Sequence, residues 1–364
     1  MNGRFAVKFS SMRTRLAAIS LLALAALAIA AVSSARSAGS GWTIHTKGWI
    51  EAIDMQGGTV AYDVAAPNTG CNRLFVRRGG KTTSVGGKVT CRADSTSTGA
   101  GVREIALAGP RIAWIVNIGG NTESQDTLLT SSLAKPKEKQ VAEATRTGDV
   151  DSVLTGDWLG GLVGRSNAPA LFAYNAWSTD GSGQITTAAL RRNTGASTAL
   201  VADGPETLRA ASISGPRIAV LHTDGSVVLF ASDGSGLLGT IQPPAQTRAI
   251  ALDGTRLAVL TKGSKLELYN ATNQAPLASL GVAPGSLPFI DMSSEIVVYA
   301  TGHRLRALSI SSGNSAVLAT VKRNIKAVEI EPAGIVYYWN TVSGIKSVGV
   351  LSFIPMQSVA AALG

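Results

Sequence analysis

The chain has 364 residues, with 33 Lys and Arg, 23 Asp and Glu, and a formal net charge of +10. No stretch gathers five or six basic residues, which argues against a nucleic-acid-binding or heparin-binding surface. Forty glycines and many short runs of Val, Ile and Leu favour an all-β globular protein.

Residues 1–35 have the pattern of an export signal. Four basic residues precede an uncharged apolar run from Leu16 to Val32, and small residues then fit a cleavage site after Ala35. An uncleaved N-terminal anchor is the alternative, because the run just reaches the lower bound for a membrane span. We therefore expect a secreted or cell-surface protein that touches a membrane only through such an anchor.

Two cysteines, Cys71 and Cys91, follow in the exported part of the chain. An even number of cysteines in an oxidising compartment favours a disulfide between them. Closing a loop of this size would stabilise the fold by roughly 3 kcal/mol. A pair of free thiols is the alternative.

Apolar segments that follow a turn recur along the rest of the chain and define seven units. Their first core residues are Val60, Ile112, Leu159, Ile218, Leu257, Ile296 and Ile335. The last four lie 39 residues apart, and the first three are spaced more widely. A period near 40 without a helical pattern is typical of stacked β-units, most often the blades of a propeller.

Each unit has the pattern of four strands, the second of which is nearly continuously apolar and therefore buried on both faces. The last unit lacks a fourth strand after Ile354, and the alternating segment Trp42–Lys47 lies just before the first unit. We expect this N-terminal strand to close the ring, because closure removes exposed sheet edges. The prediction is an all-β, seven-bladed β-propeller of four-stranded blades, with residues 41–364 as one domain.

The segment Lys265–Leu280 resembles the third and fourth strands of WD-repeat, TolB-type and quinoprotein-type propellers. The resemblance covers most of the mature chain at the level of the β-propeller superfamily. The Trp-Asp dipeptide of WD repeats is absent, Gly-His occurs once, at Gly302-His303, and the tryptophan pattern of quinoproteins is not repeated. The resemblance therefore implies a propeller fold and no particular site residues.

The extra residues of units one to three are expected in loops on one face, where the innermost strands begin. These predicted loops are Ala65–Asn72, Arg92–Gly101, Asn117–Asp126 and about Arg165–Gln184. Loops elaborated on one side of a rigid scaffold commonly carry binding. Neutral insertion is the alternative.

Basic residues recur nine positions before the core residue of several units, at the start of the innermost strand. They are Arg103, Arg209, Arg248 and Lys326. The other three units have Glu51, Val150 and Leu287 at this position. Cations around one mouth of the channel would hold a carboxylate or a phosphate. A solvated rim is the alternative.

Nothing in the sequence has the pattern of a catalytic or metal site. His45, His222 and His303 lie in separate units, so no metal ligand set is expected, and no cofactor is expected. Glu123, Asp126 and Asp180 are the acids that an enzyme would use, and Trp114, Trp158, Tyr174 and Trp177 would then line a carbohydrate cleft or, alternatively, the core.

We therefore expect an exported, non-catalytic binding scaffold, monomeric, that engages a protein or a small anionic ligand through the loops of units one to three. The alternative is an extracytoplasmic glycoside hydrolase or lyase that uses loop carboxylates at the mouth of the channel.

Overall fold

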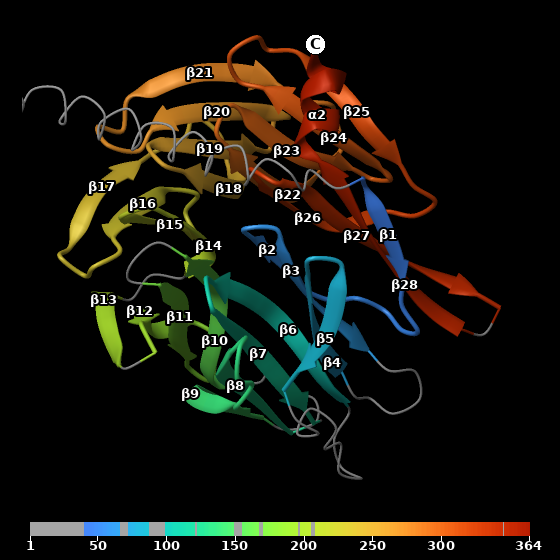
Figure 1. Ribbon diagram of the computed structural model, residues 1–364. Coiled ribbons are helices and arrows are strands. Elements are labelled where there is room, and N and C mark those ends of the chain that lie inside the picture. Colours follow the sequence, from blue (N-terminus) through green and yellow to red (C-terminus); the bar gives the residue numbers. More distant parts are fainter. Residues whose placement is uncertain are drawn as a thin grey trace, which may run out of the picture. The chain divides into compact units, whose positions relative to one another are not determined.

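The computed structural model describes residues 40–65, 72–86, 99–120, 122–148, 155–166, 170–195, 197–204, 208–344 and 346–364. Residues Gly41–Gly364 form one compact body built mainly of antiparallel strands (Figure 1). The predicted all-β class is therefore confirmed. The export signal of residues 1–35 lies outside the described residues, as do Cys71 and Cys91.

Most strands pair in chain order within four-stranded sheets, which we number as units. Unit 1 contains β2 (Ile53–Gln56), β3 (Thr59–Ala65), β4 (Asn72–Arg78) and β5 (Lys81–Val85). Unit 4 contains β14 (Leu208–Ser214), β15 (Arg217–His222), β16 (Val227–Ala231) and β17 (Leu237–Ile241). Unit 5 contains β18 (Thr247–Asp253), β19 (Arg256–Thr261), β20 (Lys265–Asn270) and β21 (Pro276–Gly281). Unit 6 contains β22 (Ser286–Ser293), β23 (Ile296–Thr301), β24 (Arg304–Ser309) and β25 (Ser315–Thr320).

Units 2 and 3 are joined in one eight-stranded sheet. Unit 2 contains β6 (Gly99–Ala108), β7 (Arg111–Gly119), β8 (Glu123–Ser132) and β9 (Lys139–Thr147). Unit 3 contains β10 (Thr155–Arg165), β11 (Leu171–Thr179), β12 (Ile185–Asn193) and β13 (Thr198–Gly204). The join is short, because β9 and β10 pair only at Thr147 with Thr155 and at Arg146 with Gly156.

The two ends of the described chain meet in the remaining sheet, unit 7. It contains β26 (Ile325–Glu331), β27 (Gly334–Ser343), β28 (Lys346–Pro355) and β1 (Trp42–His45). The N-terminal strand β1 pairs antiparallel with β28, with Ile44 opposite Leu351. Trp42 stacks on Phe353 with ring centroids 5.6 Å apart, and Arg77 of unit 1 lies over the Trp42 ring. Side chains of unit 1 therefore contact the strand that completes unit 7.

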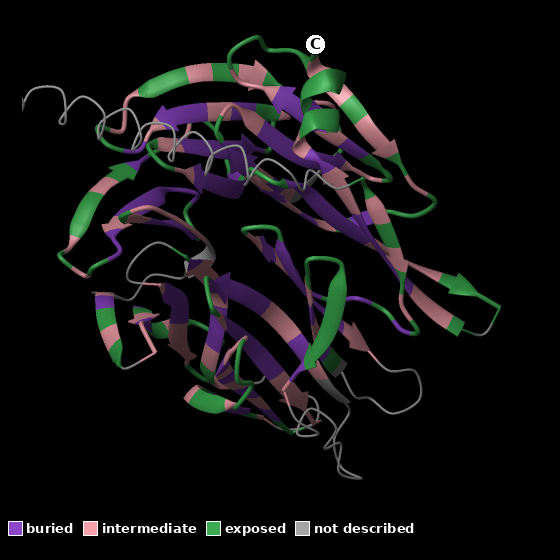
Figure 2. Ribbon diagram, in the orientation of Figure 1, coloured by how far each residue is buried: buried purple, intermediate pink, exposed green. Residues whose placement is uncertain are grey.

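The second strand of most units is buried along most of its length, as its continuous apolar sequence predicts (Figure 2). Hydrophobic clusters lie between successive sheets, and one of them joins Leu221 and Leu229 of unit 4 to Leu252 and Leu257 of unit 5. The outermost strands, such as β5 and β21, are largely exposed. Each sheet is thus packed between two neighbours.

The first strands of the units contact one another in a cyclic order. β2 contacts β6, and the contacts continue through β10, β14, β18 and β22 to β26, which contacts β2. These seven strands surround a central pocket, described below. We call the side where they begin the start face and the side where they end the end face. Because strands alternate in direction, the hairpins between second and third strands also turn at the start face.

The register of the repeat differs from the predicted one in unit 6. Leu257 lies opposite Leu252 across its hairpin, and the equivalent pair in unit 6 is Val297 with Met292. The spacing of equivalent residues is therefore 40 and then 38 around Val297, and Ile296 occupies the position of Arg256. The error arises because both residues are apolar and β-branched, so local sequence does not choose between them.

In unit 3 the predicted core residue Leu159 lies on the first strand, β10, and the buried second strand is β11. The segment from Arg165 to Gln184, which was predicted to be a loop, therefore contains the strand β11, and that prediction is wrong. The predicted loop Asn117–Asp126 is mainly an extension of the β7–β8 hairpin, in which Asn117 pairs with Asp126. The extra length of units 2 and 3 thus extends their strands. Most of the other two predicted loops lies outside the described residues.

A C-terminal helix, α2 (Met356–Leu363), follows β28 and was not predicted. It begins after Pro355, which suits a helix start, and its Val359 is fully buried in a cluster with residues of units 6 and 7. Among the described residues no helix is long and apolar enough to cross a membrane.

Pairing of β1 with β28 predicts that a proline at Ile44 destabilises the protein. Thr46 donates its N–H to the carbonyl of Gly349, so by alternation the N–H of Ile44 also points toward β28. Ile44→Pro should lower the free energy of unfolding in urea by roughly 1–3 kcal/mol. The control His45→Pro replaces an N–H that points away from β28 and should cost less than Ile44→Pro. Equal stability of Ile44→Pro and the unmodified protein would show that β1 does not hold unit 7.

Candidate functional site

Side chains on the first strands accept hydrogen bonds from the main chain of the next unit. Asp54, Ser212 and Asp291 occupy equivalent positions on their first strands. Each lies six residues before the core residue of its second strand, which is Val60, Ile218 or Val297. They accept the N–H groups of Leu107, Leu252 at 3.0 Å and Ile330 at 2.7 Å, respectively. The same contact thus recurs at three junctions between units.

A second set of contacts lies one step nearer the end face. Gln56 accepts the N–H of Gly109 at 2.7 Å, and Ser214 accepts the N–H of Gly254 at 2.9 Å. Asp253 accepts the N–H of Ser294 at 2.5 Å. Glu331 is hydrogen-bonded to the main chain of Gly57. Between units 2 and 3, Glu104 accepts the N–H of Leu162 at 2.7 Å. Between units 3 and 4, Arg165 donates to the carbonyl of Gly215. Every pair of neighbouring first strands is therefore bridged by a side chain.

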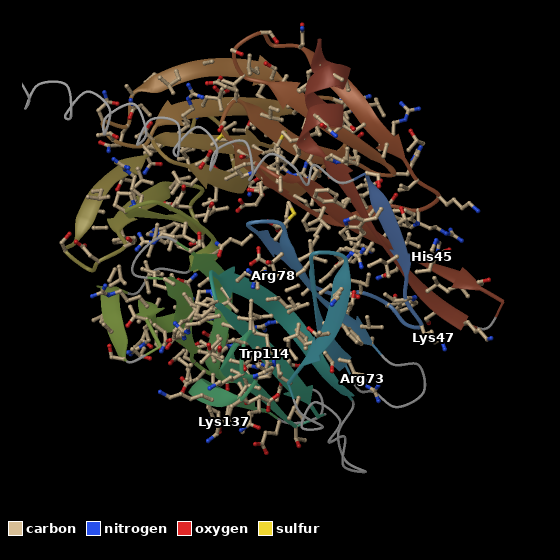
Figure 3. All side chains as sticks on the ribbon, viewed as in Figure 1. His45, Lys47, Arg73, Arg78, Trp114 and Lys137 are labelled. Carbon is tan, nitrogen blue, oxygen red and sulfur yellow. The ribbon has the colours of Figure 1, made fainter. Side chains whose placement is uncertain are left out.

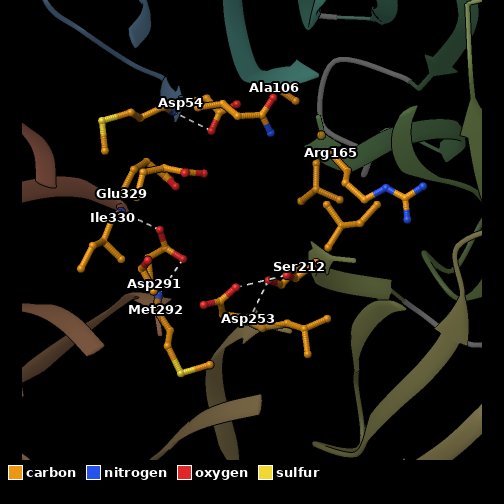
Figure 4. Close-up of a pocket in the computed structure, with 18 of the residues that line it drawn as sticks. Asp54, Ala106, Arg165, Ser212, Asp253, Asp291, Met292, Glu329 and Ile330 are labelled. Atoms are coloured by element: carbon orange, nitrogen blue, oxygen red, sulfur yellow. Dashed lines mark hydrogen bonds between the residues drawn. The ribbon is translucent and has the colours of Figure 1, made fainter. Parts of the chain in front are cut away.

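These acids line a central pocket of about 480 Å³ (Figure 4). The carboxyl groups of Asp54, Asp253, Asp291 and Glu329 converge on it, and Glu331 also lines it. The guanidinium of Arg165 is directed away from them and donates to Ser232 Oγ at 2.6 Å. The pocket thus gathers several carboxyl groups at one place.

Removal from water raises the pKa values of Asp54, Glu331, Asp291 and Glu329. It raises the pKa of Asp54 to about 8, that of Glu331 to about 7 and that of Asp291 to about 6. The pKa of Glu329 is also raised well above its usual value, first by burial and then by the charges of Asp291 and Asp54. Glu329 and Asp291 are hydrogen-bonded to each other, which requires a proton on one of them.

Carboxyl groups dominate the chemistry of this pocket. Within the part of the chain that the structure describes, no group of His, Cys, Asp and Glu side chains is arranged to hold a metal ion. Asp54, Asp253, Asp291 and Glu331 are each engaged with the main chain of the following unit. Their first role is therefore to hold neighbouring units together.

The predicted basic positions share a structural feature that the sequence did not show. The pairing of first and second strands is irregular at Arg103, Arg209, Arg248 and Lys326, which marks a β-bulge at each of them. A bulge re-aims the side chain it carries. Val150, the predicted equivalent in unit 3, lies outside the described residues, and the bulge of that unit falls between Gly160 and Val163.

The four basic residues do not form a uniform ring. Arg103 is paired with Asp126 at 3.3 Å and also donates to the carbonyl of Leu159. Arg248 and Lys326 are exposed, and Lys326 lines a separate pocket on the start face. The structure describes the backbone at Arg209 but not its side chain. The described geometry therefore does not bring all four cations together around one anion.

Asp126, one of the three acids predicted for an enzyme, is a structural residue. It is fully buried and accepts hydrogen bonds from Arg146 at 2.6 Å and Asn117 at 2.8 Å. Burial alone would raise the pKa of Asp126, but these bonds and the charge of Arg103 lower it. Of the other two acids, Glu123 is exposed on β8 and Asp180 accepts the N–H groups of its own turn. The three acids are not brought together.

The predicted aromatic cluster is divided between core and surface. Trp114 and Tyr174 are buried in the core, where Trp114 lies within unit 2 (Figure 3). Trp158 and Trp177 are half-buried and stack with ring centroids 6.0 Å apart. Arg146 lies over the Trp158 ring at 3.9 Å. Sequence alone gives no sign that Trp158 and Trp177 face each other across two strands.

A surface groove of about 470 Å³ lies between units 2 and 3, near the start face. Its rim includes Glu143 of β9, Asp157 of β10 and the exposed Arg191 and Thr187 of β12. The buried Tyr174 contributes to its floor. Asp157 accepts a hydrogen bond from Ser178 at 2.5 Å, and Glu143 accepts from Gln125 at 2.6 Å. We call this the blade 2–3 groove.

The raised pKa values predict that stability falls as pH rises. In the unfolded chain these acids ionise near pH 4, whereas Asp54 in the folded protein keeps its proton up to about pH 8. The folded state thus binds more protons between pH 4 and 8, and each extra proton lowers stability by about 1.4 kcal/mol per pH unit. Asp126, whose pKa is lowered, acts in the opposite sense only below about pH 4.

Glu329→Gln should therefore be more stable than the unmodified protein at pH 8 and little changed at pH 5. The free energy of unfolding in urea at the two pH values measures this. The exposed Glu123→Gln is the matched control and should leave the pH dependence unchanged. A Glu329→Gln variant with an unaltered pH dependence would show that this carboxyl group is not held out of water.

No protein family and no curated protein matches the sequence. Among solved structures, the chain is similar to the WD40 β-propeller domain of Doa1, with a TM-score of 0.51 and 14% identity over 85% of this chain and 95% of that domain. It is also similar to the computationally designed Ika8 protein, with a TM-score of 0.47 and 13% identity over 85% of this chain and 97% of that chain. The first likeness, together with the antiparallel sheets, shows a β-propeller fold.

Proposed function

We propose that the protein is an exported, monomeric and non-catalytic β-propeller that binds a protein or a small ligand at its start face, between blades 2 and 3. In this proposal the units are seven blades, and β1 closes the ring. The cyclic contacts of the first strands and the pairing of β1 with β28 support that architecture.

The observation that carries the proposal is the blade 2–3 groove. Its volume of about 470 Å³ falls within the range of small-molecule sites, roughly 300–1,000 Å³. Arg191 and Thr187 are exposed at its rim, and no hydrogen bond or ion pair of the described residues engages the Arg191 guanidinium. Polar groups that are not committed to the fold are available to a ligand.

The long hairpins of units 2 and 3 add to this support. Strands β6 to β12 have 9 to 11 residues, whereas β14 to β17 of unit 4 have 5 to 7. The extra residues extend the β7–β8 hairpin at the start face. Binding surfaces on rigid scaffolds commonly arise from such local elaboration.

The alternative of an enzyme rests on one observation, the hydrogen-bonded carboxyl pair of Asp291 and Glu329 in the central pocket. Two carboxyl groups with raised pKa values are the usual means of acid–base hydrolysis. The pair, however, lies toward the end face, and Asp291 also accepts the main-chain N–H of Ile330. A structural role accounts for these acids without a reaction, because they hold neighbouring blades together.

Filling the groove tests the binding proposal. A thermal-shift screen against neutral oligosaccharides, short peptides and small organic acids should find one class that raises the melting temperature. Thr187→Trp should weaken its binding at least about tenfold by occupying the groove. The exposed Thr320→Trp on β25 is the matched control and should change binding less than about twofold.

Equal binding by Thr187→Trp and the unmodified protein would place the ligand elsewhere and contradict the groove. Chemical conversion of the bound compound that stops in Glu329→Gln would establish the enzyme instead.

Export is tested separately by Edman sequencing of the protein from the extracytoplasmic fraction. Cleavage after Ala35 predicts Arg36 as the first residue. Sequence beginning at Met1 in the membrane fraction would show an uncleaved anchor, and recovery from the cytoplasm alone would contradict export.

A further inference from the structure

A second pocket lies on the start face where units 7 and 1 meet, and we call it the seam pocket. Its volume is about 460 Å³. It is lined by Trp49, Ile50, Glu51, Arg323, Lys326, Tyr338, Asn340, Thr341 and Val342. These residues come from the segment before β2, the turn that leads into β26 together with the start of β26, and the end of β27. It is separate from the blade 2–3 groove, with which it shares no residue.

The polar floor of the seam pocket is already satisfied. Tyr338 donates its hydroxyl to the carbonyl of Glu51 at 2.7 Å. The Asn340 amide donates to the carbonyl of Ile50 at 2.7 Å and accepts the N–H of Ile50 at 3.0 Å. These bonds fix β27 of unit 7 to the segment that leads into unit 1, so the floor is rigid and offers no free polar group.

The cations at the rim are not engaged. Arg323 and Lys326 are exposed, and in the described ranges the side chain of neither makes a hydrogen bond or an ion pair. Lys326 stands on the bulge of β26, which sets it apart from the regular strand. Glu51 is the one carboxylate among the lining residues. The rim is therefore positive on balance and suits an anion.

Apolar surface adjoins these cations. Trp49 is 44% exposed and Val342 is 57% exposed, although both are large hydrophobic residues. The position of Trp49 is fixed, since its carbonyl accepts the N–H of Ala65 at 2.8 Å. A ligand that places an apolar group between them would remove this surface from water, which favours binding.

The β27–β28 hairpin also leaves a free strand edge beside the pocket. Residues Asn340–Ser343 pair with Lys346–Gly349 of β28, but β26 reaches β27 only as far as Trp339. In the part of the chain that the structure describes, no strand covers the other edge of Thr341–Ser343. Such an edge can accept an added strand from a partner.

We propose that the seam pocket binds an extended, acidic peptide segment of a partner protein. The segment adds a short strand to the free edge of β27, its carboxylates pair with Arg323 and Lys326, and an apolar side chain lies between Trp49 and Val342. The basic net charge of the protein favours the encounter with an acidic partner.

The test uses the mature protein and a fluorescein-labelled heptapeptide, Glu-Val-Glu-Leu-Glu-Thr-Glu, in a fluorescence anisotropy titration. We expect binding that weakens at least about tenfold in the double variant Arg323→Glu/Lys326→Glu. Val342→Glu should also weaken binding, because it places a carboxylate where the apolar side chain lies. The matched control Lys137→Glu/Lys139→Glu reverses two exposed cations at the β8–β9 turn, where Lys137 is labelled in Figure 3. It should change binding less than about twofold.

Equal loss in the two double variants would show attraction by net charge alone and overturn the proposal. Absence of binding by the unmodified protein, or equal binding of the same peptide with Lys in place of Glu, would overturn it as well. Displacement of the peptide by millimolar free glutamate would assign the pocket to a small carboxylate rather than to a peptide. Loss of binding in Thr187→Trp would place the peptide in the blade 2–3 groove, so the two sites are tested separately.

Discussion

The structure depends on hydrogen bonds that one first strand accepts from the main chain of the next. The first strands contact one another around the central pocket, but among the described residues they do not pair with one another as a sheet. The short join between units 2 and 3 is made by the fourth strand β9 with β10. Main-chain N–H groups on their free edges therefore need other acceptors. Asp54, Ser212 and Asp291 supply them from the same position in three units, and each bond fixes one sheet against the next. The arrangement of the units rests on the repetition of this contact.

The acidity of the central pocket follows from that framework. A carboxylate makes a stronger acceptor than a hydroxyl, but several carboxylates in one pocket repel one another and lose hydration. The result is the raised pKa values of Asp54, Asp291, Glu329 and Glu331. Perturbed pKa values commonly mark active sites, but structural networks produce them too. Here the bonds to the neighbouring unit explain why the acids stand where they do.

The sequence predicted the features that local pattern determines. The all-β class, the buried second strands and the alternating segment at Trp42 follow from runs of apolar residues and turns, and the structure contains each of them. The register of unit 6 was predicted wrongly because Ile296 and Val297 are alike, and only pairing across the hairpin separates them. The structural role of Asp126 does not follow from the sequence, because its partner Arg146 is 20 residues away and no local pattern links the two. The bulges at the basic positions also depend on the partner strand, so no single strand reveals them.

The same bulge position has different consequences in different units, and the neighbouring chain decides which. In unit 2 the bulge carries Arg103, and the extended β8 strand brings Asp126 within 3.3 Å of it, so the cation becomes part of the fold. In unit 7 the bulge carries Lys326, and the side chains beside it on the floor of the seam pocket are Tyr338 and Asn340, which are already bonded to the main chain of unit 1. No acid of unit 7 reaches Lys326 among the described residues, so its charge stays available to solvent. A repeated framework can therefore place equivalent side chains at every unit, while the residues that remain free for binding are set by what each neighbour leaves unpaired.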